Sequence, residues 1–228
     1  MKFNLATGVG SVVLFTAVAG MSACQTNPVT GKSKINFYSY EEEKALGDEY
    51  APQILIQLGG EYPDPELQRY VTEVGRKVEQ KGRDYIKAQG NDFPTWEFKY
   101  YVVNDSLVNA FALPGGHIFV TRGILDQMST EAQLAGLLGH EASHVFLRHG
   151  AEGMSRGVVL QLGGMLGAAA LGVIIGDELG ALAGGLFMMG VNLIAMKYSR
   201  GQESDSDKFG QRFAVQANYE ANGIIELM

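Results

Sequence analysis

The segment His140-Glu141-Ala142-Ser143-His144 constrains this chain more than any other part of the sequence. In a helix, residues four apart lie about 40° apart around the axis and roughly 6 Å along it. A helix here would project both imidazoles from one face, where they can share one zinc ion. Glu141 would lie beside the ion, placed to accept a proton from a zinc-bound water and return it to a leaving amine. The segment therefore predicts a hydrolytic zinc site, although an ordinary amphipathic helix can carry the same pattern by chance.

A catalytic zinc site needs a third protein ligand as well as one open position. The chain has four histidines, and His117 and His149 lie outside the segment above. His149 follows His144 by five residues, about 140° around a continuous helix, so we expect it to face elsewhere. His117 lies in a predicted strand before the helix, from which it could approach the metal. A carboxylate from a later helix is the remaining source.

Residues 197–209 supply that carboxylate in our interpretation. Glu203 and Asp207 are one helical turn apart and therefore share a face. We predict that Glu203 binds the zinc, while Asp207 accepts a hydrogen bond from a ligand histidine and sets its tautomer. With the two histidines of the motif, this completes the ligands of one zinc ion per chain. The alternative is a solvated acidic face, which is our interpretation of Asp205.

Cap residues and apolar periodicity predict the elements around this site. Ser39 and Glu42 form a capping box at the start of one helix, and Pro65 opens the next. Ser129 or Thr130 caps the helix that carries the motif. The expected helices cover 40–57, 65–82 or 65–88, a short stretch near 126–128, and 131–149 with Gly150 at its end; the expected strands cover 96–103, 109–113 and 117–120.

The stretch 157–196 permits several interpretations. Two apolar runs, 157–176 and 179–196, are each about 20 residues long, close to the length that crosses a bilayer. They are rich in Gly and Ala and also contain Gln161 and Asn192. We consider, in order of preference, buried or amphipathic helices beside the active site, a hairpin that contacts membrane or hydrophobic substrate, and a membrane-spanning pair. Glycines at small-xxx-small spacing allow close helix contact in each case.

Residues 1–23 have the pattern of a secretory signal peptide, with Lys2 before a mostly apolar run. Small residues precede Cys24 as in a bacterial lipobox, although Met21 stands where Leu is usual. We therefore predict cleavage before Cys24 and a lipid on its thiol. By the bacterial sorting rule, Gln25 then directs the protein to the outer membrane, provided that the cell is Gram-negative. The alternative is an uncleaved N-terminal helix with an incidental cysteine.

Turn residues suggest how the remaining chain is divided. Pro28 and Gly31 lie in a short segment before the first expected helix, which predicts a turn-rich tether. We therefore expect a signal peptide at 1–23, a lipidated N-terminus and tether at 24–38, and a metallopeptidase domain at 39–228 with an apolar helical insert at 157–196.

Composition excludes two properties. The chain has 25 acidic and 18 basic side chains and a formal net charge of −7. We expect no nucleic-acid partner, because such proteins need a basic face. A single cysteine also excludes an internal disulfide.

The motif His140-Glu141-x-x-His144 followed by Glu203-x-x-x-Asp207 resembles the gluzincin zinc metallopeptidases of peptidase family M48. That family includes HtpX membrane proteases, CAAX prenyl proteases and a branch of periplasmic lipoproteins, and the resemblance covers nearly the whole mature chain. It implies an α+β, zincin-like metalloprotease fold, mostly helical with a small antiparallel sheet beside the motif helix. It also implies protein or peptide substrates.

Further segments carry the same resemblance. Asn109-Ala110-Phe111, before Pro114-Gly115-Gly116, looks like the edge strand and turn of the family, which implies that substrate backbone pairs there. Ser206 departs from the pattern, because family members usually have Ala at that place. The family also continues to a His-Pro motif and further helices, so a truncation at the C-terminus stays open.

We therefore hypothesise a zinc endopeptidase anchored in the bacterial periplasm at the outer membrane, where it degrades misfolded or mislocalised envelope proteins. A rival from another class is a lipoprotein chaperone or binding module that uses the apolar stretch 157–196 and has a latent zinc site. A third possibility is an integral membrane protease, which would stay in the membrane without residues 1–24.

Overall fold

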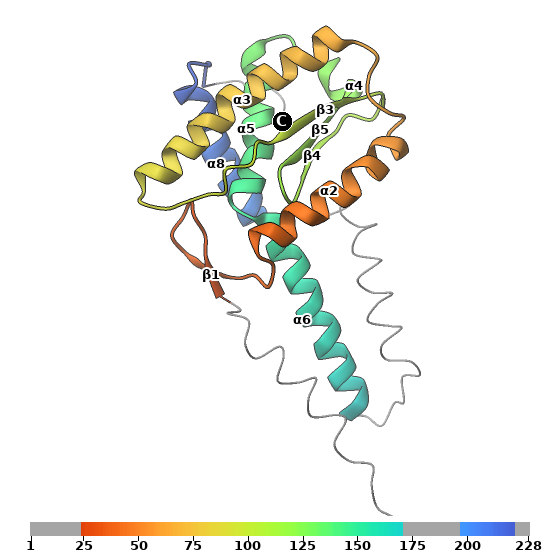
Figure 1. The fold of residues 1–228 in the computed structure, drawn as a ribbon, viewed down its shortest axis with the longest axis vertical. Helices are drawn as coiled ribbons and strands as arrows, with labels where there is room; N and C mark the ends of the chain where they lie inside the picture. The colour runs from red at the N-terminus through yellow and green to blue at the C-terminus, as the bar shows by residue number, and fades with distance from the viewer. Residues whose placement is uncertain (1–23, 171–196, 222–228) are drawn as a thin grey trace, which may run out of the picture.

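The computed structural model describes residues 24–170 and 197–221 (Figure 1). The predicted signal peptide and the part 171–196 of the apolar stretch lie outside the described residues. The helices are α2 (Tyr40–Gln57), α3 (Pro65–Ala88), α4 (Arg122–Leu125), α5 (Glu131–Phe146), α6 (His149–Ala170) and α8 (Arg200–Gln216), and the strands are β1 (Cys24–Thr26), β2 (Ser33–Ile35), β3 (Lys99–Val103), β4 (Ala110–Leu113) and β5 (His117–Thr121).

Local capping signals account for where the helices begin. Ser39 and Glu42 form the predicted capping box of α2, and Thr130 caps α5 in the same way with Gln133. Pro65 occupies the first turn of α3, which runs to the longer of its two expected ends. These starts are confirmed because they depend on side chains that satisfy neighbouring backbone N–H groups.

The fold class α+β is confirmed, but the sheet beside α5 is mixed rather than purely antiparallel. Its strand order is β3-β5-β4, with β5 antiparallel to β4 and parallel to β3. The turn Pro114–Gly116 joins β4 and β5 as a hairpin, helped by positive φ angles of 80° and 87° at Gly115 and Gly116. Because β5 returns between its two predecessors, it becomes the central strand and β4 an outer strand.

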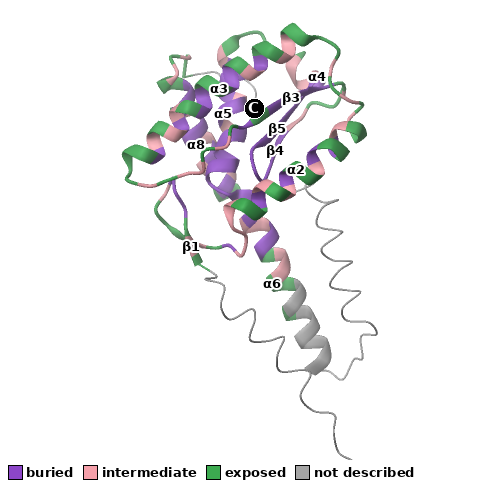
Figure 2. Ribbon diagram, in the orientation of Figure 1, coloured by how far each residue is buried: buried purple, intermediate pink, exposed green. Residues whose placement is uncertain are grey.

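Helices cover both faces of this sheet, as Figure 2 shows by the purple strands between α3, α5 and α2. Side chains alternate between two apolar clusters: Ile118 and Val120 of β5 pack with α3, α5 and α8, whereas Phe119 packs with α2. All five residues of β5 are buried. The sequence alternation is incomplete in this strand because both of its faces are buried.

The motif helix is shorter than predicted. We expected it to reach residue 149 and end at Gly150, but α5 ends at Phe146 and α6 begins at His149. Arg148 adopts a positive φ of 57°, a conformation usually left to glycine. Its guanidinium donates to buried Glu43 at 2.6 Å and lies 4.0 Å over the ring of Tyr40. These long-range contacts hold a turn that local sequence does not indicate.

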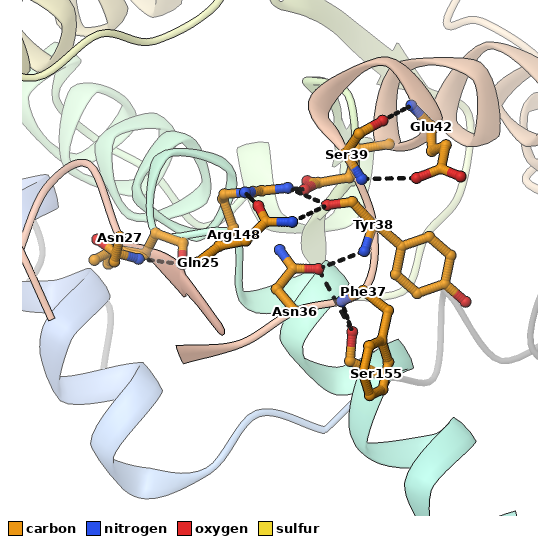
Figure 3. A network of polar contacts seen from close by, with 11 residues as sticks. Gln25, Asn27, Asn36, Phe37, Tyr38, Ser39, Glu42, Arg148 and Ser155 are labelled. Carbon is orange, nitrogen blue, oxygen red and sulfur yellow. Dashed lines mark hydrogen bonds and ion pairs between the residues drawn. The ribbon is translucent and has the colours of Figure 1, made fainter. Parts of the chain in front are cut away.

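The expected tether, residues 24–38, packs against the domain as a two-stranded ribbon. β1 and β2 pair antiparallel, and the Asn27 side chain donates to the carbonyl of Leu147 at 2.6 Å. Figure 3 shows how Arg148 also reaches the Gln25 side chain and the carbonyl of Tyr38. Turn residues predicted a turn-rich segment, but neither its strand pairing nor its docking, because the partners in the domain lie more than 100 residues later.

α6 leaves the body of the molecule and projects away from it (Figure 1). Its first turns contact β2, where Lys34 pairs with Glu152, and Ser155 accepts a hydrogen bond from Phe37 N, just after β2, at 2.9 Å. Farther along, Val159 and Leu160 are exposed. The first part of the stretch 157–196 is thus helical. Among the described helices, none combines the length and apolar character needed to cross a membrane.

Candidate metal centre

The two histidines of the motif lie on α5, and α8 packs directly against that helix. Glycine is required on both sides of this contact. A Cβ added to Gly210 would lie 2.5 Å from the backbone nitrogen of His140, and one added to Gly139 would lie 2.6 Å from the oxygen of Gly210. The missing side chains let the two backbones approach closely, which brings Glu203 of α8 beside the histidines.

Three potential ligand atoms converge at this contact. The Nε2 atoms of His140 and His144 lie 2.9 Å apart. Glu203 Oε2 lies 3.3 Å from the first and 3.8 Å from the second. A tetrahedral zinc ion with bonds of about 2.0–2.1 Å places its ligand atoms about 3.3 Å from one another. The donor set and its spacing therefore fit zinc, and within 24–170 and 197–221 this is the one such group of three.

Each histidine of this cluster also uses its other ring nitrogen. Nδ1 of His140 lies 2.8 Å from Oδ1 of Asp207, the position that the predicted role of Asp207 requires. Nδ1 of His144 lies 3.0 Å from Nδ1 of His149. Both imidazoles thus direct Nε2 toward the same point, with a partner behind each.

Glu141 is buried, with 6% of its surface exposed, beside this cluster. The pKa of Glu141 is raised to about 7, mainly by burial and also by Glu203, while His140 and a hydrogen bond from the Ala112 backbone oppose the shift. A carboxyl group whose pKa lies near neutrality suits proton transfer in both directions. This is the property that the predicted catalytic role needs.

Burial also determines the charge of the nearby imidazoles. The pKa of His144 is lowered to about 2 and that of His149 to about 3, mainly by burial and to a lesser extent by neighbouring basic groups. The ring of Tyr198 stacks on His144 with centroids 3.9 Å apart. Both histidines are therefore neutral at pH 7, which is the form in which imidazole binds a metal.

His117, considered above as a third ligand, lies in a different environment. Its Nε2 atom is 2.9 Å from Oδ1 of Asp48, and its Nδ1 atom is 3.1 Å from the hydroxyl of Tyr101. Both ring nitrogens thus have protein partners on α2 and β3. The structure does not bring His117 into the group of three potential ligands.

His149 is the residue whose place the sequence did not predict. A continuous helix would have turned it away from the site, but α5 ends before it and Arg148 adopts a positive φ between α5 and α6. His149 therefore returns to the back of His144. The position of His149, five residues after His144, could have drawn attention to it. Its orientation, however, depends on where α5 ends, and no local residue predicts that end.

The predicted substrate strand lies at the outer edge of the sheet. Asn109 O accepts a hydrogen bond from Thr121 N at 3.1 Å, so the backbone of Asn109 faces β5. In an antiparallel pair the direction of the backbone N–H and C=O groups alternates along the strand. The backbone groups of Phe111 therefore also point toward β5, and those of Ala110 and Ala112 point away from it. The contact between Ala112 and Glu141 agrees with this orientation. Of the three predicted residues, Ala110 directs its backbone groups away from the sheet.

Residues 73–228 match the profile of peptidase family M48. The chain belongs to this family. The resemblance seen in the motifs is thereby confirmed over more than half of the sequence, and the match includes α5, α8 and the whole cluster of potential ligands.

Curated relatives are similar over most of this chain. Mitochondrial metalloendopeptidase OMA1 of Schizosaccharomyces pombe is 29% identical over 199 residues, which cover 86% of this chain and 53% of that protein. The beta-barrel assembly-enhancing proteases of Yersinia pestis and Escherichia coli K12 are 29% and 28% identical over 186 and 201 residues. Those alignments cover 80% and 85% of this chain but 36% and 38% of the relatives. This chain therefore corresponds to about half of these relatives or less.

Proposed function

We propose that this chain is a zinc-dependent metalloendopeptidase. The observation that carries the proposal is the convergence of His140 Nε2, His144 Nε2 and Glu203 Oε2 at distances that suit one tetrahedral ion. Membership of family M48 and relatives named as metalloendopeptidases support the same reaction class. We assign the ligand role to these three residues and the catalytic role to Glu141.

The protein groups around the ion have separate tasks in this proposal. Bound zinc would polarise the scissile carbonyl and lower the pKa of a water molecule. Glu141 accepts the proton of that water and, in its acid form, donates it to the leaving amine. Asp207 holds the tautomer of His140, because a carboxylate at 2.8 Å requires the proton on Nδ1.

Extended polypeptide is the substrate that the strand edge suits. Ala110 and Ala112 present outward backbone groups at the end of the sheet, and the Ala112 backbone reaches Glu141. A substrate strand that pairs here would bring its backbone to the catalytic carboxylate. Main-chain pairing tolerates many sequences, which agrees with unfolded proteins as substrates.

The cellular role is a further part of the proposal. We propose action on misfolded or mislocalised proteins of the bacterial envelope, with the chain anchored to the periplasmic face of the outer membrane by lipid on Cys24. Two of the relatives above carry a name that refers to beta-barrel assembly. Cys24 is exposed at the start of β1, so its thiol is accessible for modification.

The reaction is tested by Glu141→Gln in purified protein. We expect one zinc ion per chain in both forms, and a loss of cleavage of unfolded casein by roughly 10²–10⁴-fold in the variant. Glu66→Gln, the same change at an exposed position on α3, serves as the control and keeps full activity. Undiminished cleavage by Glu141→Gln would overturn the mechanism. Equal protection of an aggregating client by both forms, without cleavage, would favour the binding-module alternative.

The anchor is tested separately with Cys24→Ser. Lipidation predicts incorporation of labelled fatty acid into the wild-type protein and its loss in the variant, which should leave the membrane fraction. If Cys24→Ser and a chain without residues 1–24 both remain in the membrane fraction, the lipid anchor is wrong and an integral membrane protease is favoured.

A further inference from the structure

Two buried histidines face each other behind the metal cluster. The Nδ1 atoms of His144 and His149 lie 3.0 Å apart, and each of these two residues has 3% of its surface exposed. Two imidazole nitrogens at this distance form a hydrogen bond only if one carries the proton and the other accepts it. When Nε2 of His144 binds a metal through its lone pair, the proton of that ring lies on Nδ1. His149 Nδ1 must then be the acceptor.

Several elements hold His149 in this place. The turn at Arg148 positions its backbone, and that turn depends on the ion pair between Arg148 and buried Glu43. From α8, Ser206 places its hydroxyl 3.4 Å from the same Nδ1 atom, and Ser206 is fully buried. A serine hydroxyl can donate to an acceptor nitrogen. The tautomer of His149 with an unprotonated Nδ1 can thus accept the shorter bond from His144, and the longer contact with Ser206 shares the same lone pair.

We propose that His149 is a positioning residue of the metal site, which accepts the Nδ1 proton of His144 and holds Nε2 of that ring toward the ion. Asp207 performs the equivalent task for His140 with a carboxylate. This inference rests on the zinc site proposed above and assigns that site a second supporting side chain. The competing explanation is that His149 only fills space between α5 and α8.

Two substitutions at this position separate hydrogen bonding from packing. His149→Leu replaces the imidazole with an apolar side chain of similar size and so removes the acceptor. His149→Asn places an amide oxygen close to where Nδ1 lies and so restores an acceptor. If His149 acts only through packing, zinc affinity should be retained better in His149→Leu. If it orients His144 through a hydrogen bond, zinc affinity should be retained better in His149→Asn. Asp207→Ala reports the size of the corresponding effect at His140.

The experiment measures zinc affinity by competition with a fluorescent chelator, together with the absorption spectrum of the cobalt-substituted protein. Thermal unfolding of each metal-free form measures any structural cost. We expect His149→Leu to weaken zinc binding roughly 10–100-fold and to alter the cobalt spectrum. His149→Asn should recover most of this loss, even if its metal-free form is less stable than that of His149→Leu.

Other outcomes overturn the proposal in distinguishable ways. If the wild type binds no zinc, the proposed function fails and this inference fails with it. If the wild type binds zinc and cleaves casein but His149→Leu retains its affinity, only the role of His149 is wrong. If His149→Asn binds zinc as weakly as His149→Leu, hydrogen bonding is excluded as the cause. Should His149→Leu fail to fold, normal affinity and cobalt spectrum in His149→Asn but not in His149→Ala would support the proposal, and equal affinity in both would overturn it.

Discussion

His140 and His117 each lie beside an aspartate, in two regions of the molecule with different surroundings. Asp207 approaches Nδ1 of His140 at 2.8 Å, and Asp48 approaches Nε2 of His117 at 2.9 Å. The partner of the other ring nitrogen distinguishes the two histidines. In His117 that nitrogen meets the hydroxyl of Tyr101, whereas in His140 it faces two further potential ligand atoms. A carboxylate beside a histidine is therefore weak evidence of a metal site, and the environment of the other nitrogen is stronger evidence.

Packing explains why His117 took the structural role. It starts β5, the buried central strand, and α2 passes so closely that a Cβ on Gly47 would lie 2.9 Å from the His117 ring. Asp48 and Tyr101 then connect helix to sheet through one imidazole. We call Asp48, Tyr101 and His117 the α2 clamp, in contrast to the metal cluster of His140, His144 and Glu203.

The largest expected effect distinguishes the metal cluster from ordinary surface acids. Glu203→Ala should weaken zinc binding by roughly 10³-fold or more, about 4 kcal/mol, because it removes one of three protein ligands. Casein cleavage should fall with the bound zinc. Asp205→Ala, on the same helix, is the matched control and should retain both. Zinc binding by Glu203→Ala equal to that of the control would remove Glu203 from the ligand set.

A second prediction concerns the turn that separates α5 from α6. Arg148→Met should lower the free energy of unfolding by about 3 kcal/mol, because it leaves the buried carboxyl group of Glu43 without its ion-pair partner. Urea denaturation of the metal-free protein measures this change. The exposed pair of Arg69 and Glu73 provides the contrast, since Arg69→Met should cost less than about 1 kcal/mol. Equal losses for the two variants would show that the buried pair does not hold the turn.

Disrupting the α2 clamp should cause a smaller loss in the free energy of unfolding and should leave zinc affinity unchanged. His117→Leu should reduce the free energy of unfolding by about 1–2 kcal/mol through the loss of its hydrogen bonds to Asp48 and Tyr101. Zinc affinity should stay within about twofold of the wild type, because neither ring nitrogen of His117 faces the metal cluster. Chelator competition and urea denaturation on the same sample check both parts. A loss of zinc affinity comparable to that of Glu203→Ala would break the comparison.

The smallest expected effect is the pH dependence of the same clamp. Partial burial acts to raise the pKa of Asp48, but hydrogen bonds from Lys44 and His117 outweigh it and lower the pKa to about 2. The folded state thus favours the charged form, so its stabilising contribution is present above about pH 4 and lost as pH falls through 2. With 44% of the side chain exposed, this contribution should stay below about 1 kcal/mol.

This dependence is measured in metal-free protein by urea denaturation at pH 5 and pH 2.5. The difference in stability between wild type and Asp48→Asn should be present at pH 5 and shrink at pH 2.5. A difference that stays constant with pH would show that the effect does not come from the charge of Asp48.

Much of the fold was predictable where neighbours along the chain decide it. The capping box at Ser39, the cap expected at Ser129 or Thr130 and the proline at the start of α3 located three helix starts correctly. The short helix expected near 126–128 was misplaced, because Thr121 caps α4, which covers Arg122–Leu125 and ends before that stretch. β3 begins at Lys99 rather than at residue 96. Element ends were less predictable, since they depend on packing.

The motif His140-Glu141-x-x-His144 determined by itself that two imidazoles share a helical face, and this motif together with the downstream acidic pair indicated the family. Helical periodicity and capping act over a few residues, so the sequence expresses them directly. The tertiary structure decided which further groups meet that face. Asp207 reaches His140 across 67 residues, and His149 reaches His144 only because Arg148 ends the helix. Such contacts depend on the close packing of α5 against α8 at Gly139 and Gly210, a property of the assembled core rather than of any local segment.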